Sequence, residues 1–178
     1  MPTSREIPVL YSAEEIEERI ITLAREIALK LPPDLMIVSL LKGSFVFTAD
    51  LIRALYKIGL HPQVDFMTLS SYGASTESAK TVTINRDLTE EVKDRHVLIL
   101  DDILESGRTL QFARNLISQR NAASSRIVVL LEKPGKREVP ISADFVGFTI
   151  PDKFVVGYGL DYANYYRELP YVGILDIH

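Results

Sequence analysis

The chain has 178 residues, of which 47% are hydrophobic and 25% charged, an ordinary composition for a globular protein that predicts one domain over residues 1–178. Its 20 basic and 24 acidic side chains give a net charge of -4, which does not favour nucleic acid as the main partner. The sequence has no cysteine, which excludes thiolate catalysis, disulfides and cysteine-ligated zinc. It shows no secretory signal and no apolar run of the roughly 18 residues that a membrane span needs, so we expect a cytoplasmic protein.

The first part of the chain alternates helical and strand patterns. Ser12 and Glu15 have capping-box spacing, and apolar residues then recur at helical spacing up to a pair of prolines. A short, almost wholly apolar run follows, which is typical of a strand covered on both faces. The elements expected here are a helix over 13–30, a strand over 35–41, a helix over 45–58 and a strand over 64–69.

The middle of the chain continues this alternation after a small, polar stretch. Residues 70–80 contain one aromatic residue, Tyr72, and we expect them to form an exposed, mobile loop. The elements expected next are strands over 81–85 and 97–100, a helix from about Thr109 and a strand over 127–131. Strands that alternate with helices predict an α/β fold, with a doubly wound, mostly parallel sheet flanked by helices and a ligand site at the carboxyl ends of its strands.

The end of the chain departs from the alternation. Residues 145–150 and 154–157 are short strand patterns separated by a Pro-Asp turn, and the segment after them is rich in tyrosine. We expect this region to form a small extra element beside the sheet.

The segment DDILESGR, residues 101–108, carries the clearest functional signal because it follows an apolar strand and precedes a helix. Ser106, Gly107 and Thr109 are small, so backbone N–H groups at the helix start can point at a phosphate. Asp101 and Asp102 suit sugar hydroxyls or a Mg²⁺ ion carried by a polyphosphate. The pattern predicts a sugar-phosphate site, but an acidic turn capped before a helix has the same local spacing, and both interpretations stay open.

Familiar catalytic motifs are missing from the sequence. It contains no phosphate-binding G-x-x-x-x-G-K-[ST], no dinucleotide-binding G-x-G-x-x-G after a strand, no G-x-S-x-G elbow and no H-E-x-x-H. The histidines are His61, His96 and His178, and they lack the spacing of metal ligands. A histidine triad and a zinc site are therefore not expected.

The segment VLILDDILESGRTL resembles the signature of type I phosphoribosyltransferases for phosphoribosyl diphosphate (PRPP). Four further segments are similar, in the same order, to those of bacterial hypoxanthine (guanine) phosphoribosyltransferases: SLLKGSFVFTADLIRAL, VDFMTLSSYG, LLEKPGKR and DFVGFTIPDKFVVGYGLDYANYYRELPYVGIL. The resemblance implies the type I phosphoribosyltransferase fold, with a hood built from the N-terminal segment and about 150–178. It also implies transfer of phosphoribosyl from PRPP to hypoxanthine and guanine, dependence on Mg²⁺, and a homodimer or homotetramer.

The same resemblance implies roles for the central loop. Asp101 and Asp102 face the ribose hydroxyls and Mg²⁺, and Glu105 takes the position of the general acid/base near purine N7. The residues implied for the 5′-phosphate are Ser106, Gly107, Arg108 and Thr109. Most of the family has Asp in place of Glu105, so the resemblance leaves the geometry, pKa and rate of this carboxylate open.

For the leaving pyrophosphate, the resemblance points to Arg167 and to the loop of Leu41, Lys42 and Gly43, with a cis peptide between Leu41 and Lys42. Judged by local sequence alone, Lys42 would more often be a solvated lysine at a strand end. For Arg167 the local sequence fits a surface arginine that packs over tyrosines as well as a phosphate-binding one, and both interpretations stay open.

For the purine, the resemblance implies that Lys133 reads the oxygen at C6, which selects hypoxanthine or guanine over adenine. Phe154 stacks on the ring and Val155 contacts the base edge through its backbone. Asp161 belongs to the purine side and to a second Mg²⁺. Ser71 and Tyr72 match a lid that excludes water.

Two other interpretations fit parts of the sequence. A PRPP-sensing regulator would share the fold without turnover, but the carboxylate at Glu105, Lys133 and the Ser71-Tyr72 pair argue against it. A phospho-accepting receiver domain would carry its acidic pair after the first strand, whereas Asp101 and Asp102 come more than halfway along the chain.

Overall fold

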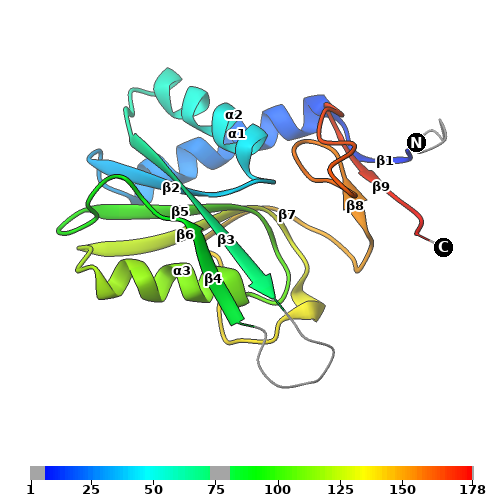
Figure 1. Cartoon of the computed structure of the whole chain (residues 1–178). Helices are drawn as coiled ribbons and strands as arrows, with labels where there is room; N and C mark the ends of the chain where they lie inside the picture. Colours follow the sequence, from blue (N-terminus) through cyan, green and yellow to red (C-terminus); the bar gives the residue numbers. More distant parts are fainter. Residues whose placement is uncertain (1–6, 73–80, 178) are drawn as a thin grey trace.

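The computed structural model describes residues 7–72 and 81–177, which fold around a six-stranded sheet in the order β4-β3-β2-β5-β6-β7 (Figure 1). Neighbouring strands run parallel except β4, which lies antiparallel to β3 at one edge. The strands are β2 (Leu35–Leu41), β3 (Gln63–Tyr72), β4 (Thr81–Arg86), β5 (His96–Leu104), β6 (Ser124–Glu132) and β7 (Phe145–Thr149). The expected mostly parallel sheet is confirmed.

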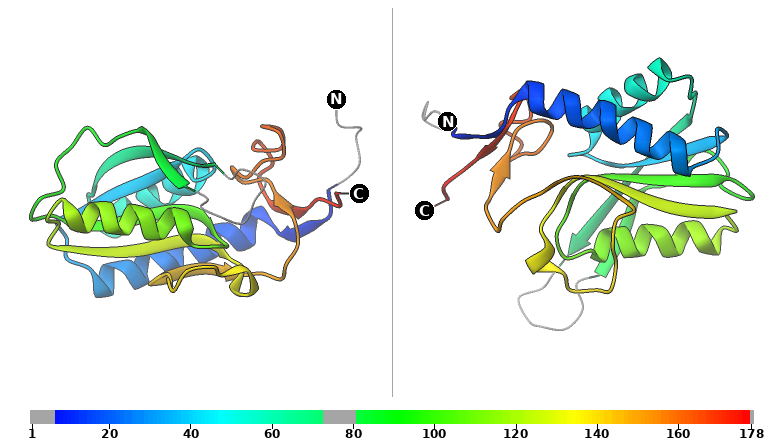
Figure 2. Two further views of the ribbon diagram at one scale, coloured as in Figure 1. Left: turned by 60° about the horizontal axis from the view of Figure 1, so that its bottom comes forward. Right: turned by 180° about the vertical axis from the view of Figure 1, so that it is seen from behind.

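Helices cover both faces of this sheet (Figure 2). α1 (Ala13–Lys30) and α2 (Phe45–Lys57) pack on one face and α3 (Arg108–Gln119) on the other. Side chains of a strand point alternately to its two faces, so Leu98 joins the core under α1 and α2 while Ile99 joins the core under α3. Double coverage explains why the central strands are apolar throughout.

A second, three-stranded antiparallel sheet forms the hood. It joins β1 (Val9–Tyr11), β9 (Val172–Ile174) and β8 (Val155–Val156) in that order, so the first and the last strand of the chain lie side by side (Figures 1 and 2). The expectation that 145–150 belongs to this small element is wrong, because β7 pairs with β6 and completes the main sheet.

Two strands run further than their apolar cores predict. β5 extends through Leu104 because β6 continues beside it and pairs Leu104 with Glu132, so Asp101 and Asp102 lie in the strand and not in a loop. β3 extends to Tyr72 because β4 pairs with its end, so Ser71 also lies in a strand. The rest of the expected lid, 73–80, lies outside the described residues. No helix in the described ranges is both long and apolar enough to cross a membrane.

Asp65 in β3 anchors the segment that leads from β4 to β5. Its carboxylate is 6% exposed and accepts hydrogen bonds from the backbone N–H groups of Phe66 (2.8 Å), Thr89 (2.8 Å) and Glu90 (2.9 Å). Desolvation raises the pKa of Asp65, but the hydrogen bonds from Glu90, Phe66 and Thr89 together outweigh it, and the net pKa lies below its usual value. The ionised carboxylate therefore stabilises the fold.

We expect Asp65→Asn to lower the free energy of unfolding at pH 7 by about 1–3 kcal/mol, because the amide keeps one acceptor oxygen and its NH₂ group would face N–H donors where the second carboxylate oxygen now accepts. The folded pKa lies below the unfolded value of about 3.9, so the stabilisation is present above that pH and is lost as pH falls through the folded pKa. Urea titrations of both proteins at pH 7 and at a pH well below the unfolded pKa measure this change.

The matched control is Asp34→Asn, whose side chain is 82% exposed and pairs with Arg95 at 3.3 Å. A surface pair of this kind contributes about 0–1 kcal/mol. A gap between Asp65→Asn and wild type that stays the same at both pH values would contradict the assigned role of the charge.

Candidate active site

A pocket of about 270 Å³ lies at the carboxyl ends of β2 and β5, where a doubly wound sheet places its ligands. It is lined by residues 40–43, 101–107, 109 and 110. The structure therefore brings the predicted pyrophosphate loop, the acidic pair, Glu105 and the phosphate loop into one pocket, although the two lining segments lie far apart in the sequence.

The acidic pair lies in the last part of β5 and lines this pocket. The backbone N–H of Asp102 donates to the carboxylate of Asp101 at 2.9 Å, and that of Ile103 donates to Asp102 at 2.8 Å. Desolvation and the neighbouring charge of Asp102 raise the pKa of Asp101 well above its usual value. Desolvation also raises the pKa of Asp102, although hydrogen bonds and the charge of Arg167 oppose the rise. Ribose hydroxyls or a divalent cation bound here would stabilise the ionised carboxylates and reduce the repulsion between them.

The donor set fits a Mg²⁺ ion that takes most of its ligands from a substrate. Mg²⁺ is typically held by one or two carboxylates together with substrate phosphates and water, and the acidic pair supplies two carboxylates. Residues 7–72 and 81–177 contain no group of three His, Cys, Asp or Glu side chains that could hold an ion alone. Asp161, predicted for a second ion, instead pairs with Arg167 at 3.0 Å and accepts from the N–H of Asn164 at 2.7 Å.

The phosphate loop turns directly into α3. Gly107 is the N-cap residue at φ 83°, where an added Cβ would lie 2.3 Å from Ile141, so this position requires glycine. Ser106 accepts the N–H of Arg108 at 3.3 Å. The side chain of Arg108 is paired with Glu138, so a phosphate at this loop would be held by backbone N–H groups and hydroxyls at the start of α3 and not by this guanidinium.

The pyrophosphate loop approaches the acidic pair without a side chain between them. The peptide bond between Leu41 and Lys42 is cis, as the family resemblance implies. A Cβ at Gly43 would lie 1.8 Å from Oδ2 of Asp102, so position 43 has no room for a side chain. The side chain of Lys42 is exposed.

Three buried hydroxyls support this loop from below. Ser39 Oγ lies 2.8 Å from Ser44 Oγ and 2.7 Å from Thr48 Oγ1, and Ser44 donates to the carbonyl of Leu40 at 2.5 Å. All three residues are at most 2% exposed. The sequence analysis missed this cluster, although Ser39 is a lone polar residue inside the apolar run of β2 and could have indicated it.

Glu105 and Lys133 form an ion pair beside the pocket. Lys133 Nζ lies 2.5 Å from Glu105 Oε1, and the lysine is 6% exposed. The N–H of Lys133 also donates to the carbonyl of Leu104 at 2.9 Å, which fixes the end of β6 against that of β5. The residue predicted to exchange a proton with the purine and the residue predicted to read its C6 oxygen are thus brought together.

Four of the remaining predicted residues lie on the hood, outside the lining of the 270 Å³ pocket: Phe154, Val155, Asp161 and Arg167. Phe154 is 40% exposed and is therefore not a core residue, and Tyr162, which the sequence analysis missed, meets its ring edge-on at 5.8 Å between centroids. Val155 is buried in β8. Arg167 donates to the carbonyl of Gly159 at 2.7 Å. At the end of β3, Ser71 is exposed, and the side chain of Tyr72 lies outside the described part of the structure.

These features match one class of proteins. The family model for the phosphoribosyl transferase domain matches residues 10–163. Hypoxanthine phosphoribosyltransferase of Escherichia coli K12 is 45% identical over 170 residues, which cover 94% of each chain.

Solved structures agree with this match. The Staphylococcus aureus hypoxanthine phosphoribosyltransferase is 43% identical, with a TM-score of 0.88 over 94% of this chain and 90% of that one. That of Trypanosoma cruzi is 39% identical, with a TM-score of 0.90 over 98% and 95% of the two chains. The chain belongs to the phosphoribosyltransferase family, in its hypoxanthine phosphoribosyltransferase branch.

We expect Gly43→Ala to weaken PRPP binding roughly ten- to a hundred-fold, because overpacking costs about 1–3 kcal/mol and each ~1.4 kcal/mol is a factor of ten. The added methyl group displaces the carboxylate of Asp102, which lies where the Cβ would be. Isothermal titration calorimetry with PRPP and Mg²⁺ measures the effect.

The control for this variant is Gly135→Ala, because a Cβ at Gly135 has no neighbour within 4 Å. Unchanged PRPP affinity in Gly43→Ala would mean that the contact between Gly43 and Asp102 does not shape the PRPP site.

Proposed function

We propose that the chain is a purine-salvage enzyme that transfers the phosphoribosyl group of PRPP to N9 of hypoxanthine, and also of guanine, and releases pyrophosphate. The single observation that carries this proposal is the pair of Glu105 and Lys133, held beside the acidic pair and the phosphate loop at one edge of the sheet. Family membership supports the same reaction. The compartment we propose is the cytoplasm, on the cysteine-free composition.

In this proposal PRPP lies along the 270 Å³ pocket. The backbone N–H groups of 106–109 and the hydroxyls of Ser106 and Thr109 hold its 5′-phosphate, and Asp101 and Asp102 hold the ribose hydroxyls. The loop 41–43 and Arg167 hold the diphosphate. When bound with PRPP between these groups, Mg²⁺ would neutralise charge on the leaving diphosphate.

The reaction breaks the bond from C1 of the ribose to the diphosphate oxygen and forms the bond from C1 to N9 of the base. The proton that the base loses passes to Glu105 near N7, while Lys133 donates to the oxygen at C6. The ribosyl centre is oxocarbenium-like in the transition state, so catalysis is mainly positioning and charge. Phe154 and Val155 hold the base, Asp161 supports the purine side, and Ser71 and Tyr72 belong to a lid that excludes water.

Lys133 makes the site selective for 6-oxopurines. Hypoxanthine and guanine offer an oxygen acceptor at C6, whereas adenine offers an amino group. With adenine bound, the buried ammonium of Lys133 would face another donor, and an unsatisfied buried charge carries a large penalty. We therefore expect adenine to be a poor substrate.

Purified protein with PRPP and Mg²⁺ is expected to convert hypoxanthine and guanine, and little adenine, in an ultraviolet absorbance assay. Glu105→Gln is expected to lower kcat by about 10²–10⁴, because general acid/base catalysis contributes that factor. Removal of Mg²⁺ with EDTA is expected to abolish turnover.

The control variant is Glu91→Gln, an exposed glutamate on the segment before β5. If PRPP binds but no base turns over in wild-type protein, the enzyme assignment is wrong and the PRPP-sensing regulator replaces it.

We also propose that the protein forms a homodimer, or a tetramer of two such dimers. α2 and the residue after it carry three exposed apolar residues that the chain's own core leaves uncovered: Phe45 (45%), Tyr56 (68%) and Ile58 (39%). Exposed apolar groups that lie along one helix are typical of a contact with another chain, and a second copy is the commonest partner.

Light scattering after size exclusion is expected to give at least twice the monomer mass, and Tyr56→Lys is expected to shift it toward the monomer because it buries a charge in the contact. Leu29→Lys on α1, at a residue 87% exposed, is the control and is expected to change nothing. A monomer at all concentrations would contradict the proposed assembly.

A further inference from the structure

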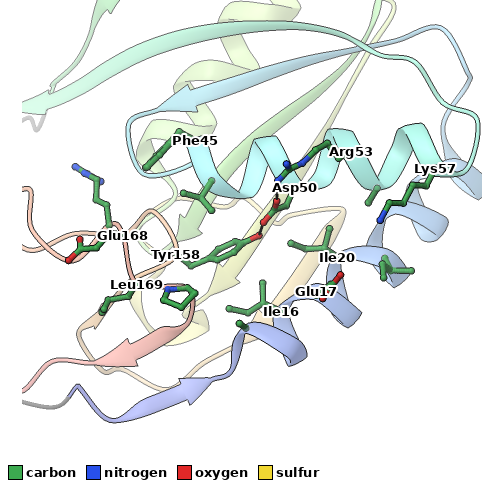
Figure 3. Close-up of a pocket in the computed structure, with 16 residues that line it drawn as sticks. Ile16, Glu17, Ile20, Phe45, Asp50, Arg53, Lys57, Tyr158, Glu168 and Leu169 are labelled. Carbon is green, nitrogen blue, oxygen red and sulfur yellow. Dashed lines mark hydrogen bonds and ion pairs between the residues drawn. The ribbon is translucent and has the colours of Figure 1, made fainter.

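A second pocket, of about 860 Å³, lies between α1, α2 and the hood segment 158–170, and no residue of it except Arg167 has a role in the proposed reaction (Figure 3). Tyr158 extends from the hood into its wall and is 6% exposed. The hydroxyl of Tyr158 donates a hydrogen bond to Oδ2 of Asp50 on α2, as the dashed line in Figure 3 marks. This bond joins two segments that are more than 100 residues apart.

Further interactions involve the two residues of this hydrogen bond, Asp50 and Tyr158. The other carboxylate oxygen of Asp50, Oδ1, pairs with Arg53 one turn along α2. Desolvation and the hydrogen bond to Asp50 raise the pKa of Tyr158 above its usual value, so the hydroxyl stays protonated and keeps its role as donor.

The turn that carries Tyr158 reaches the diphosphate end of the proposed site. Gly157, Tyr158 and Gly159 follow one another at φ 94°, 52° and 95°, in the left-handed region. A Cβ at Gly159 would lie 2.5 Å from the carbonyl oxygen of Gly43, so the hood backbone packs directly on the pyrophosphate loop.

The same turn holds Arg167. The N–H of Gly159 donates to the carbonyl of Arg167 at 3.1 Å, and Nη1 of Arg167 donates back to the carbonyl of Gly159 at 2.7 Å. The N–H of Tyr158 donates to the carbonyl of Leu169 at 2.8 Å. A shift of Tyr158 would therefore move the guanidinium of Arg167 and the contact with Gly43 together.

We propose that Tyr158 is a positioning residue for the diphosphate: its hydrogen bond to Asp50 fixes the hood on α2, so that Arg167 and the loop at Gly43 keep the spacing that PRPP requires. Tyr158 does not contact the reacting atoms and acts through Gly159. The inference rests on the proposed function, because it assumes that Arg167 and the loop 41–43 bind the diphosphate.

Tyr158→Phe removes the hydroxyl and keeps the ring that fills the wall of the pocket. We expect the KM for PRPP to rise roughly ten- to a hundred-fold, the range that loss of a hydrogen bond to a charged group produces, with the KM for hypoxanthine within about twofold of wild type. In the reverse reaction the KM for pyrophosphate is expected to rise by a similar factor. A general loosening of the fold would not separate the two substrates in this way.

Three further variants isolate the hydrogen bond. Asp50→Asn keeps an acceptor oxygen but loses the charge, so its KM for PRPP is expected to lie between those of wild type and Asp50→Ala, whereas Asp50→Ala is expected to reproduce the effect of Tyr158→Phe. In the double variant Asp50→Ala/Tyr158→Phe, the KM for PRPP is expected to be no higher than in the more affected single variant, because both substitutions remove the same hydrogen bond. The control is Tyr165→Phe, a 56% exposed hood tyrosine whose hydroxyl makes no hydrogen bond within the described residues.

Melting temperatures and calorimetric titration with PRPP and Mg²⁺ accompany the kinetics. An unchanged KM for PRPP in a folded Tyr158→Phe protein, or equal rises for both substrates, would overturn the proposal. Should wild-type protein bind PRPP without turnover, the proposed function fails, and the titration still tests whether Tyr158→Phe weakens PRPP binding.

Discussion

The site depends on backbone approaches that leave no room for a side chain. The carboxylate of Asp102 lies where a Cβ at Gly43 would be, and the carbonyl of Gly43 in turn lies 2.5 Å from where a Cβ at Gly159 would be. The end of β5, the loop after β2 and the hood therefore meet at one residue without atoms between them. In close packing of this kind, a small displacement of one segment also moves its neighbours, because there is no free space between them. The acidic pair, the pyrophosphate loop and Arg167 consequently behave as one unit.

Electrostatics explains why this unit is suited to a polyanion that carries a cation. Asp101 and Asp102 are desolvated next to each other, and the charge of Asp102 raises the pKa of Asp101 further. An anion alone would add to the repulsion, whereas ribose hydroxyls or a divalent cation would offset it. The positive groups lie around the pair: the start of α3 carries the dipole of the helix, and Arg167 lowers the pKa of Asp102 from the hood side. The ligand must therefore satisfy both signs of charge along its length.

Much of the fold could be predicted from the sequence where the signals are local. The helix over 13–30 and the strand over 35–41 are found at the predicted residues, because a capping box and an apolar run are read from neighbouring residues. The ends of β3 and β5 were placed too early, since their last residues pair with strands that follow later in the chain. Glu105 and Lys133 were found through a family motif, and their contact depends on the pairing of β5 with β6. The bond between Tyr158 and Asp50 has no local signal, because it joins distant segments and each residue alone is ordinary.

The glutamate at position 105 forms an ion pair within the proposed purine site when no substrate is bound. Its side chain is one methylene longer than the aspartate that most of the family carries, and its Oε1 meets Lys133 at 2.5 Å. Lys133 is buried, so removing its partner without a replacement would leave an unpaired buried charge. An unpaired charge of this kind costs on the order of several kcal/mol. In the proposed reaction, a base that enters would have to separate the pair and satisfy both ends. A 6-oxopurine would do so, with its oxygen for the ammonium and its ring nitrogen for the carboxylate, whereas adenine would replace only one partner. Under that proposal, the ion pair itself would contribute to selection of the base.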